Sequence, residues 1–256
     1  MAKKRGRREK KKRSMFSTIV STIVLIVAIV VMVYSAFQLY KILSRNKQAN
    51  DEYDEYKELV KEEDDDRLWI DWDALWEVNG DIIAWIHFDE PAVIDYPVVK
   101  GKDNQEYLYK TIAGYDNTYG AIFMNVDNKS DFRDFNTIIY GHRMNDKTMF
   151  GKLRNYEDKE FWEKYPYFWI YTPDDNVRRY RIYATGQVHQ DSTTYQYGFA
   201  DDEDKQNFLD YTKGAIPYDD SMEVTTDSNF VTLSTCTPAS DENRYVVVGV
   251  LEEIYK

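Results

Sequence analysis

Cysteine is the residue type that this chain has least of. Its 256 residues include one cysteine, Cys236, and three histidines. A single cysteine excludes an intramolecular disulfide, and in an exported protein it is either a buried inert thiol or a deliberately free one. The histidines are scattered and no cysteine pair accompanies them, so the ligand spacing of a zinc site is missing as well. We therefore expect neither a metal nor another cofactor.

Charge is absent from a long stretch near the N-terminus. Residues 15–40 contain no charged side chain, and Ile and Val are dense between Ile19 and Val33. About 20 apolar residues are enough to cross a bilayer as a helix. The preceding residues 1–14 hold nine Lys or Arg and one Glu, a basic cluster that marks the cytoplasmic side. We expect an uncleaved anchor with the N-terminus inside; a cleaved signal peptide, with Ser35-Ala36 as the nearest cleavage site, is the alternative.

The remainder of the chain is acidic. The net charge is −12 overall although residues 1–14 are basic, so residues 15–256 carry −20. This balance disfavours nucleic-acid binding. We expect a basic cytoplasmic tail at 1–14, a transmembrane helix at 15–40, a charged helical stalk or linker at 41–67 and an extracellular catalytic domain at 68–256. In the stalk, apolar residues recur at helical spacing: Tyr53, Tyr56, Leu59 and Val60.

Short β-like runs dominate the chain beyond Leu68. They predict strands at 81–87, 92–99, 119–125, 136–141, 166–173, 179–190, 229–235 and 244–254. Helical patterns lie between them, at 147–163 and 201–214, and a short helix is expected around Trp72 to Trp76. Several short strands separated by turns favour a mainly β fold, a closed barrel rich in antiparallel pairs with helices in its connections.

Three chemically capable side chains occupy the ends of predicted strands. Cys236 ends the apolar run 230–235, Arg244 opens the following run, and His142 comes just after the run 138–141. A thiolate is a nucleophile, an imidazole can move protons, and a guanidinium presents a fixed set of donors to an oxyanion. This combination can carry acyl transfer through a thioacyl-enzyme. His87 and His189 lack the Tyr-Gly-His context of His142 and are not expected to be the catalytic base.

The segment Thr232-Leu233-Ser234-Thr235-Cys236, followed by an arginine at a strand start, resembles the active-site signature of sortases, the cysteine transpeptidases of Gram-positive cell surfaces. Residues 140–151 resemble the histidine segment of class B sortases. The segments 79–86, 94–99 and 120–124 resemble strands of the sortase barrel. The resemblance extends over roughly residues 68–256 and implies an eight-stranded sortase-type β-barrel.

The resemblance also implies a reaction. A sortase cleaves the C-terminal sorting signal of surface proteins after a threonine and transfers the acyl group to an amine of the peptidoglycan precursor. By the signature, Cys236 is the nucleophile, His142 the general acid and base, and Arg244 the donor to the oxyanion or substrate backbone. The resemblance implies that Thr235 and Ser234 bind substrate: Thr235 is expected to shape the floor of the substrate groove, and Ser234 fills the variable slot in its class B form. The implied location is the cell membrane, with the catalytic domain outside.

Two further activities use the same residues and stay open. Thr237-Pro238 is similar to the sequence after the cysteine in pilus-building class C enzymes. Against class C, no apolar segment follows the barrel and no Asp-Pro-aromatic lid motif precedes it. Pilin polymerisation by a class B enzyme and hydrolysis by a cysteine protease differ from anchoring only in the acceptor. A tethered binding domain with an incidental cysteine is the non-enzymatic alternative.

Overall fold

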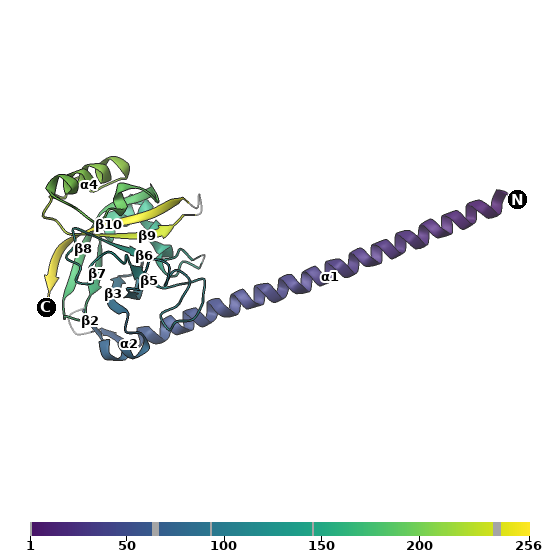
Figure 1. Cartoon of the computed structure of the whole chain (residues 1–256), viewed down its shortest axis with the longest axis horizontal. Helices are drawn as coiled ribbons and strands as arrows, with labels where there is room; N and C mark the ends of the chain where they lie inside the picture. Colours follow the sequence, from purple (N-terminus) through teal and green to yellow (C-terminus); the bar gives the residue numbers. More distant parts are fainter. Residues whose placement is uncertain (1, 63–66, 93, 145, 238–241) are drawn as a thin grey trace. The chain divides into compact units, whose positions relative to one another are not determined.

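The computed structural model describes residues 2–62, 67–92, 94–144, 146–237 and 242–256; the side chains of residues 2–14, Glu62 and Cys236 lie outside this description. The chain divides into two compact units, Met1–Gln48 and Ala49–Lys256. The first unit belongs to helix α1 (Ala2–Lys57), drawn as one continuous helix in Figure 1. From Met15 this helix is long and apolar enough to cross a membrane. An 18-residue stretch of it has a mean hydropathy of 2.8, and none of that stretch is buried. It is compatible with a membrane anchor.

The second unit begins with the last turns of α1. Ala49, Tyr53 and Tyr56 of these turns are buried in its core. Strand β1 (Val60–Glu62) follows and pairs antiparallel with β2 (Leu68–Ile70), and helix α2 (Trp72–Val78) comes next. Sequence reasoning missed this strand pair because three residues are too few to show an alternating pattern. The domain start that we expected at Leu68 stays a prediction.

Within the described residues, eight strands close into a barrel, in the order β10-β8-β7-β3-β4-β5-β6-β9 (Figure 1). The barrel is mainly antiparallel, with parallel pairs at β4–β5 and β6–β9. Each strand lies on one of the predicted runs, which confirms the mainly β, closed-barrel fold. The strands are β3 (Ile82–Phe88), β4 (Ile94–Val99), β5 (Ile122–Met124), β6 (Asn136–Tyr140), β7 (Tyr167–Tyr171), β8 (Val177–His189), β9 (Phe230–Cys236) and β10 (Asn243–Tyr255).

Helices occupy the long connections, as predicted. The pattern at 147–163 forms two helices, the 3₁₀ helix η1 (Phe150–Glu157) and α3 (Lys159–Lys164). Asp158 separates them, because its backbone is extended and its carboxylate accepts from the N–H of Glu160, capping α3. The later connection carries η2 (Thr193–Tyr195) and α4 (Asp202–Ala215), which begins at the capping residue Asp201.

Strand β10 shows how the barrel wall is buried on both faces. Val247 belongs to the core inside the barrel, whereas Val246 and Val248 belong to a second apolar cluster that includes Phe208 of α4. A strand covered on both faces reads as a continuous apolar run instead of an alternating one. Gly249 leaves room in this wall, since a Cβ there would approach the Phe168 ring to 2.4 Å. These packed strands form the rigid support for the site at their ends.

Candidate active site

Three neighbouring strands, β6, β9 and β10, bring the predicted catalytic residues to one end of the barrel wall. Cys236, the last residue of β9, pairs directly with Arg244 of β10. On the other side β9 runs parallel to β6, and Ser234 pairs with Tyr140. His142 lies two residues beyond Tyr140, just as Cys236 lies two beyond Ser234. The register therefore pairs the backbone of Cys236 with that of Arg244 and brings the end of β6, two residues before His142, beside the end of β9; the Cys236 side chain lies outside the described part of the chain.

The segment that carries His142 folds back tightly after β6. The Gly141 N–H donates to the Ser234 carbonyl at 3.0 Å, and the Phe150 N–H donates to the His142 carbonyl at 3.0 Å. Gly141 has to be small, since a Cβ there would lie 2.6 Å from the Phe150 ring. The ring of Phe150 thus packs beneath the turn and fixes where the histidine leaves the strand.

The imidazole of His142 is half-buried and held by a loop before β5. Its Nε2 lies 2.5 Å from the carbonyl oxygen of Leu108. The ring of Tyr109 lies 5.6 Å away, centroid to centroid, at 34° to the imidazole. A carbonyl oxygen can only accept, so Nε2 carries the hydrogen, and in the neutral ring Nδ1 is the unprotonated nitrogen. The ring can therefore accept a proton at Nδ1.

The guanidinium of Arg244 is also half-buried and oriented by its neighbours. Its Nη1 donates to the Asn243 carbonyl at 3.0 Å, and its Nη2 donates to Oε1 of Gln190 at 3.2 Å. Gln190 comes immediately after β8, the strand on the far side of β10. These contacts hold a permanent positive charge at the strand end occupied by Cys236. Sequence reasoning did not single out Gln190, because no spacing signal connects it with Arg244.

Ser234 and Thr235 lie on opposite faces of β9, since side chains alternate along a strand. The hydroxyl of Ser234 lies 2.7 Å from the hydroxyl of Tyr195, and the ring of Tyr195 stacks on Tyr140 at 6.3 Å. Thr235 shares its face with Leu233, a member of the core inside the barrel, and is 2 % exposed. Its hydroxyl is buried with no hydrogen-bond partner among the described residues. Ser234 therefore faces the same side as the strand position of Cys236, and Thr235 faces inward.

The other two histidines have different surroundings. His87 on β3 contacts Asp95 through Nδ1 at 3.0 Å and Asp89 through Nε2 at 3.2 Å. Burial lowers the pKa of His87, but the hydrogen bonds to Asp89 and Asp95 outweigh it and raise the pKa to about 9. His189 is exposed, 3.5 Å from Asp191. Within the described residues, no group of three His, Cys, Asp or Glu side chains is placed to hold a metal ion.

Comparison with known proteins identifies the family of the chain. A family model described as Sortase domain matches residues 90–252. The chain belongs to the sortase family. Sortase B of Staphylococcus aureus (strain NCTC 8325 / PS 47) is 31% identical over an alignment of 227 residues that covers 86% of this sortase and 91% of the relative. The range matched by the family model includes the histidine segment 140–151 and the segments 94–99 and 120–124.

Solved structures of class B sortases have the same fold as this sortase. The Staphylococcus aureus sortase B–substrate complex is 27% identical with a TM-score of 0.69, and the alignment covers 82% of this chain and 99% of that one. A Streptococcus pyogenes class B sortase involved in pilus biogenesis is 32% identical with a TM-score of 0.63, covering 72% and 98%. These matches confirm a sortase enzyme with a class B barrel.

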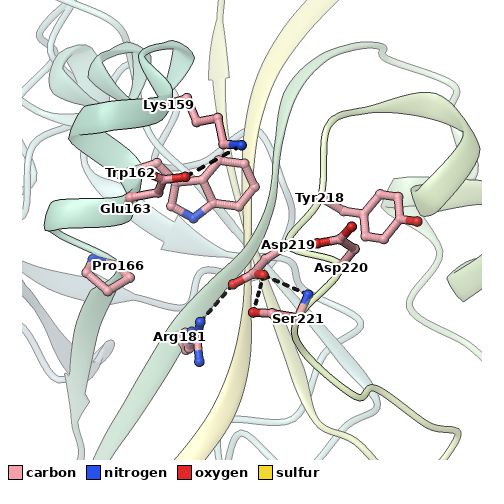
Figure 2. A pocket seen from close by; sticks show the side chains of 9 residues that line it. All are labelled: Lys159, Trp162, Glu163, Pro166, Arg181, Tyr218, Asp219, Asp220 and Ser221. Carbon is pink, nitrogen blue, oxygen red and sulfur yellow. Dashed lines mark hydrogen bonds and ion pairs between the residues drawn. The ribbon is translucent and has the colours of Figure 1, made fainter.

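A separate pocket of about 340 Å³ lies between α3, β8 and the loop that follows α4 (Figure 2). Trp162 forms part of its wall, and Arg181 pairs across its floor with Asp219 at 2.8 Å. In the strand register, Arg181 of β8 lies opposite Val250 of β10. Arg244 lies opposite Cys236, near the beginning of β10. The pocket thus lies away from the strand ends that carry the predicted catalytic residues and contains none of them.

Proposed function

We propose that this sortase is a membrane-anchored transpeptidase that uses Cys236, His142 and Arg244 on a C-terminal sorting signal. The single observation that carries the proposal is the strand register. It pairs Cys236 with Arg244, and it pairs Ser234 with Tyr140, two residues before His142. The family supplies the reaction class, acyl transfer at a peptide bond. The domain expected at 68–256 is the catalytic body of this proposal.

In the first half-reaction, His142 takes the proton of the Cys236 thiol, and the thiolate attacks the carbonyl carbon of a threonine in the sorting signal. The carbonyl electrons move to oxygen, and Arg244 stabilises this oxyanion with charged hydrogen bonds. His142 gives a proton to the nitrogen of the leaving amine as the C–N bond breaks. The product is a thioacyl-enzyme, with the threonine carbonyl bonded to the sulfur.

In the second half-reaction, an amine attacks the thioester carbonyl. His142 takes the proton from the amine nitrogen, and the C–S bond breaks to return the Cys236 thiolate. We infer that the amine belongs to the peptidoglycan precursor, so the acceptor fixes the surface protein to the cell wall. Ser234 is 2 % exposed and contributes to substrate binding through Tyr195, whose hydroxyl lies 2.7 Å from its own. Thr235 supports the groove floor from inside the barrel, through the backbone of the strand.

Pilin polymerisation is the second candidate, because a Streptococcus pyogenes class B sortase of 32% identity is involved in pilus biogenesis. It requires the same thioacyl-enzyme but a lysine side chain of another subunit as acceptor. Hydrolysis requires water instead. The three activities therefore separate by product, with the same catalytic residues in each.

The test uses residues 49–256 with quenched sorting-signal peptides, with and without triglycine or a lysine peptide as amine. We expect a thioacyl adduct in the intact mass spectrum of the wild type and none in Cys236→Ala. His142→Ala should lower turnover at least about 100-fold, the usual contribution of a general acid and base. Arg244→Lys should fall well below wild type because Lys lacks the fork of donors.

The products distinguish the candidates. A product that depends on triglycine supports wall anchoring. A product formed with the lysine peptide but not with triglycine supports polymerisation. Acid product regardless of added amine would indicate a protease. A folded domain that forms no adduct with any peptide, and whose thiol resists alkylation, would contradict the catalytic proposal.

A further inference from the structure

The loop of residues 107–120, which we call the histidine cradle, surrounds the imidazole of His142. The Nε2–H donates to the Leu108 carbonyl oxygen at 2.5 Å, and the Tyr109 ring lies 5.6 Å from the imidazole, centroid to centroid, tilted at 34° to it. Gly120, at the end of the histidine cradle, also lies close to the imidazole. Its φ is +59°, and a Cβ there would come within 3.0 Å of His142 Cδ2 and 2.6 Å of the Leu108 oxygen. The Leu108 carbonyl, the Tyr109 ring and Gly120 thus all lie close to the imidazole of His142.

The cradle is itself braced by hydrogen bonds. The Asn117 N–H donates to the Tyr109 carbonyl at 2.8 Å, which joins the two arms of the loop. From α1, the hydroxyl of Tyr53 donates to the Gly120 carbonyl at 2.7 Å, and Glu52 accepts from the Ala113 N–H at 3.2 Å. A loop closed on itself and fastened to a helix can hold a ring in one orientation, which a free surface loop cannot.

Tyr109 has no evident role in packing the core, since its exposed fraction is 60 %. Tyr115 on the same loop is 61 % exposed and makes no ring contact with His142 among the described residues. The two tyrosines therefore differ in one respect that matters for catalysis, the contact of Tyr109 with the imidazole.

Resting on the proposed function, we propose that Tyr109 is a positioning residue that keeps His142 in the Nε2–H orientation, so that Nδ1 is the atom that exchanges protons with the substrate. In the first half-reaction Nδ1 takes the proton of the Cys236 thiol and gives it to the leaving nitrogen as the C–N bond breaks. In the second, Nδ1 takes a proton from the attacking amine as the C–S bond breaks. The hydrogen stays on Nε2, which donates it to the Leu108 carbonyl oxygen throughout.

The experiment uses the full chain in detergent micelles and compares Tyr109→Ala, Tyr109→Phe and Tyr115→Ala. We expect Tyr109→Ala to lower kcat about tenfold while KM changes less than about twofold, because a misdirected acid slows the chemistry and leaves binding intact. Tyr109→Phe should recover most of the rate, since the ring makes the contact. Tyr115→Ala, the matched control, should behave as wild type, and the melting temperatures should agree.

The second readout is the ¹⁵N spectrum of the labelled histidine rings, recorded without substrate. The wild type should show His142 as the Nε2–H tautomer, and Tyr109→Ala should show a mixture of tautomers. The proposal is overturned by an Nδ1–H tautomer in the wild type, by an unchanged His142 signal in Tyr109→Ala, or by a loss confined to KM. If the wild type forms no thioacyl adduct, the proposed function fails, and the spectrum still decides the position of the imidazole.

Discussion

At the scale of single residues, His142 and His87 of this sortase differ in the groups that surround their rings. His142 contacts a carbonyl and an aromatic ring, neither of which carries charge. His87 lies between two carboxylates, Asp89 and Asp95, which together hold a proton on it. A histidine that must gain and lose a proton in each cycle is served by the first environment, and a structural ion pair by the second.

The pairing of His87 predicts a pH-dependent stability. Its pKa is raised to about 9 in the folded chain, against about 6.5 when unfolded. A raised pKa contributes stability that is complete below about pH 6.5 and is lost as the pH rises through about 9. The full shift corresponds to about 3 kcal/mol, and partial exposure of the pair reduces this.

We therefore expect the free energy of unfolding of residues 49–256 to fall between pH 6.5 and 9.5. In His87→Gln this component of the slope should disappear, while turnover at pH 7 stays near wild type. Denaturant titrations at pH 6, 8 and 9.5 on both proteins measure the difference. Equal slopes in the two proteins would show that the pair contributes nothing to folding.

Some residues of the candidate site could be predicted from the sequence, and others could not. Cys236, His142 and Arg244 could be singled out as catalytic candidates because each is a chemically distinctive side chain at the end of a predicted strand, and this assignment stays a prediction. Tyr109 and Tyr195 were not, since they are two of 22 tyrosines and no spacing relates them to the strands. Their positions depend on loop closure, which pairs residues distant in sequence.

At the scale of elements, the last turns of α1 belong to the barrel unit. Tyr53 and Tyr56 are buried, and the ring of Tyr53 meets that of Tyr96 edge-on at 5.3 Å. Helical spacing in the sequence predicted the helix here, but a charged amphipathic stretch gives no sign of what it packs against. The sequence likewise could not show the break at Asp158, which follows from a cap and not from periodicity.

Removing these turns should destabilise the barrel. We expect residues 68–256 to unfold at least about 3 kcal/mol more easily than residues 49–256, since each large buried side chain contributes about 1.5–3 kcal/mol. A chain beginning at residue 41 serves as the control and should match the one beginning at residue 49. Denaturant midpoints measure the order, and equal midpoints for all three chains would mean that the helix end adds no stability to the barrel.

The whole molecule combines a basic end, an apolar helix and an acidic body. Residues 1–14 are strongly basic and residues 15–256 carry −20. This asymmetry could be read directly from the sequence because it depends on composition alone. The closed barrel was predicted from the number and spacing of the strands, but the register that aligns Cys236 with Arg244 was not, since register arises from long-range pairing.

The asymmetry predicts one orientation in the membrane. Basic residues beside a membrane span remain in the cytoplasm, so the N-terminus should be inside and the barrel outside. In protoplasts treated with external protease, we expect the barrel to be digested and an N-terminal tag to be protected, with the tag still in the membrane fraction after an alkaline carbonate wash.

Replacing the nine Lys and Arg of residues 1–14 by Gln should mix the orientations, whereas nine Gln-for-Lys or Gln-for-Arg changes in the barrel unit should not. Release of the barrel into the medium with a new N-terminus near residue 36 would instead mean that residues 1–35 are a cleaved signal peptide. A barrel protected from external protease would reverse the orientation and remove access to a cell-wall acceptor.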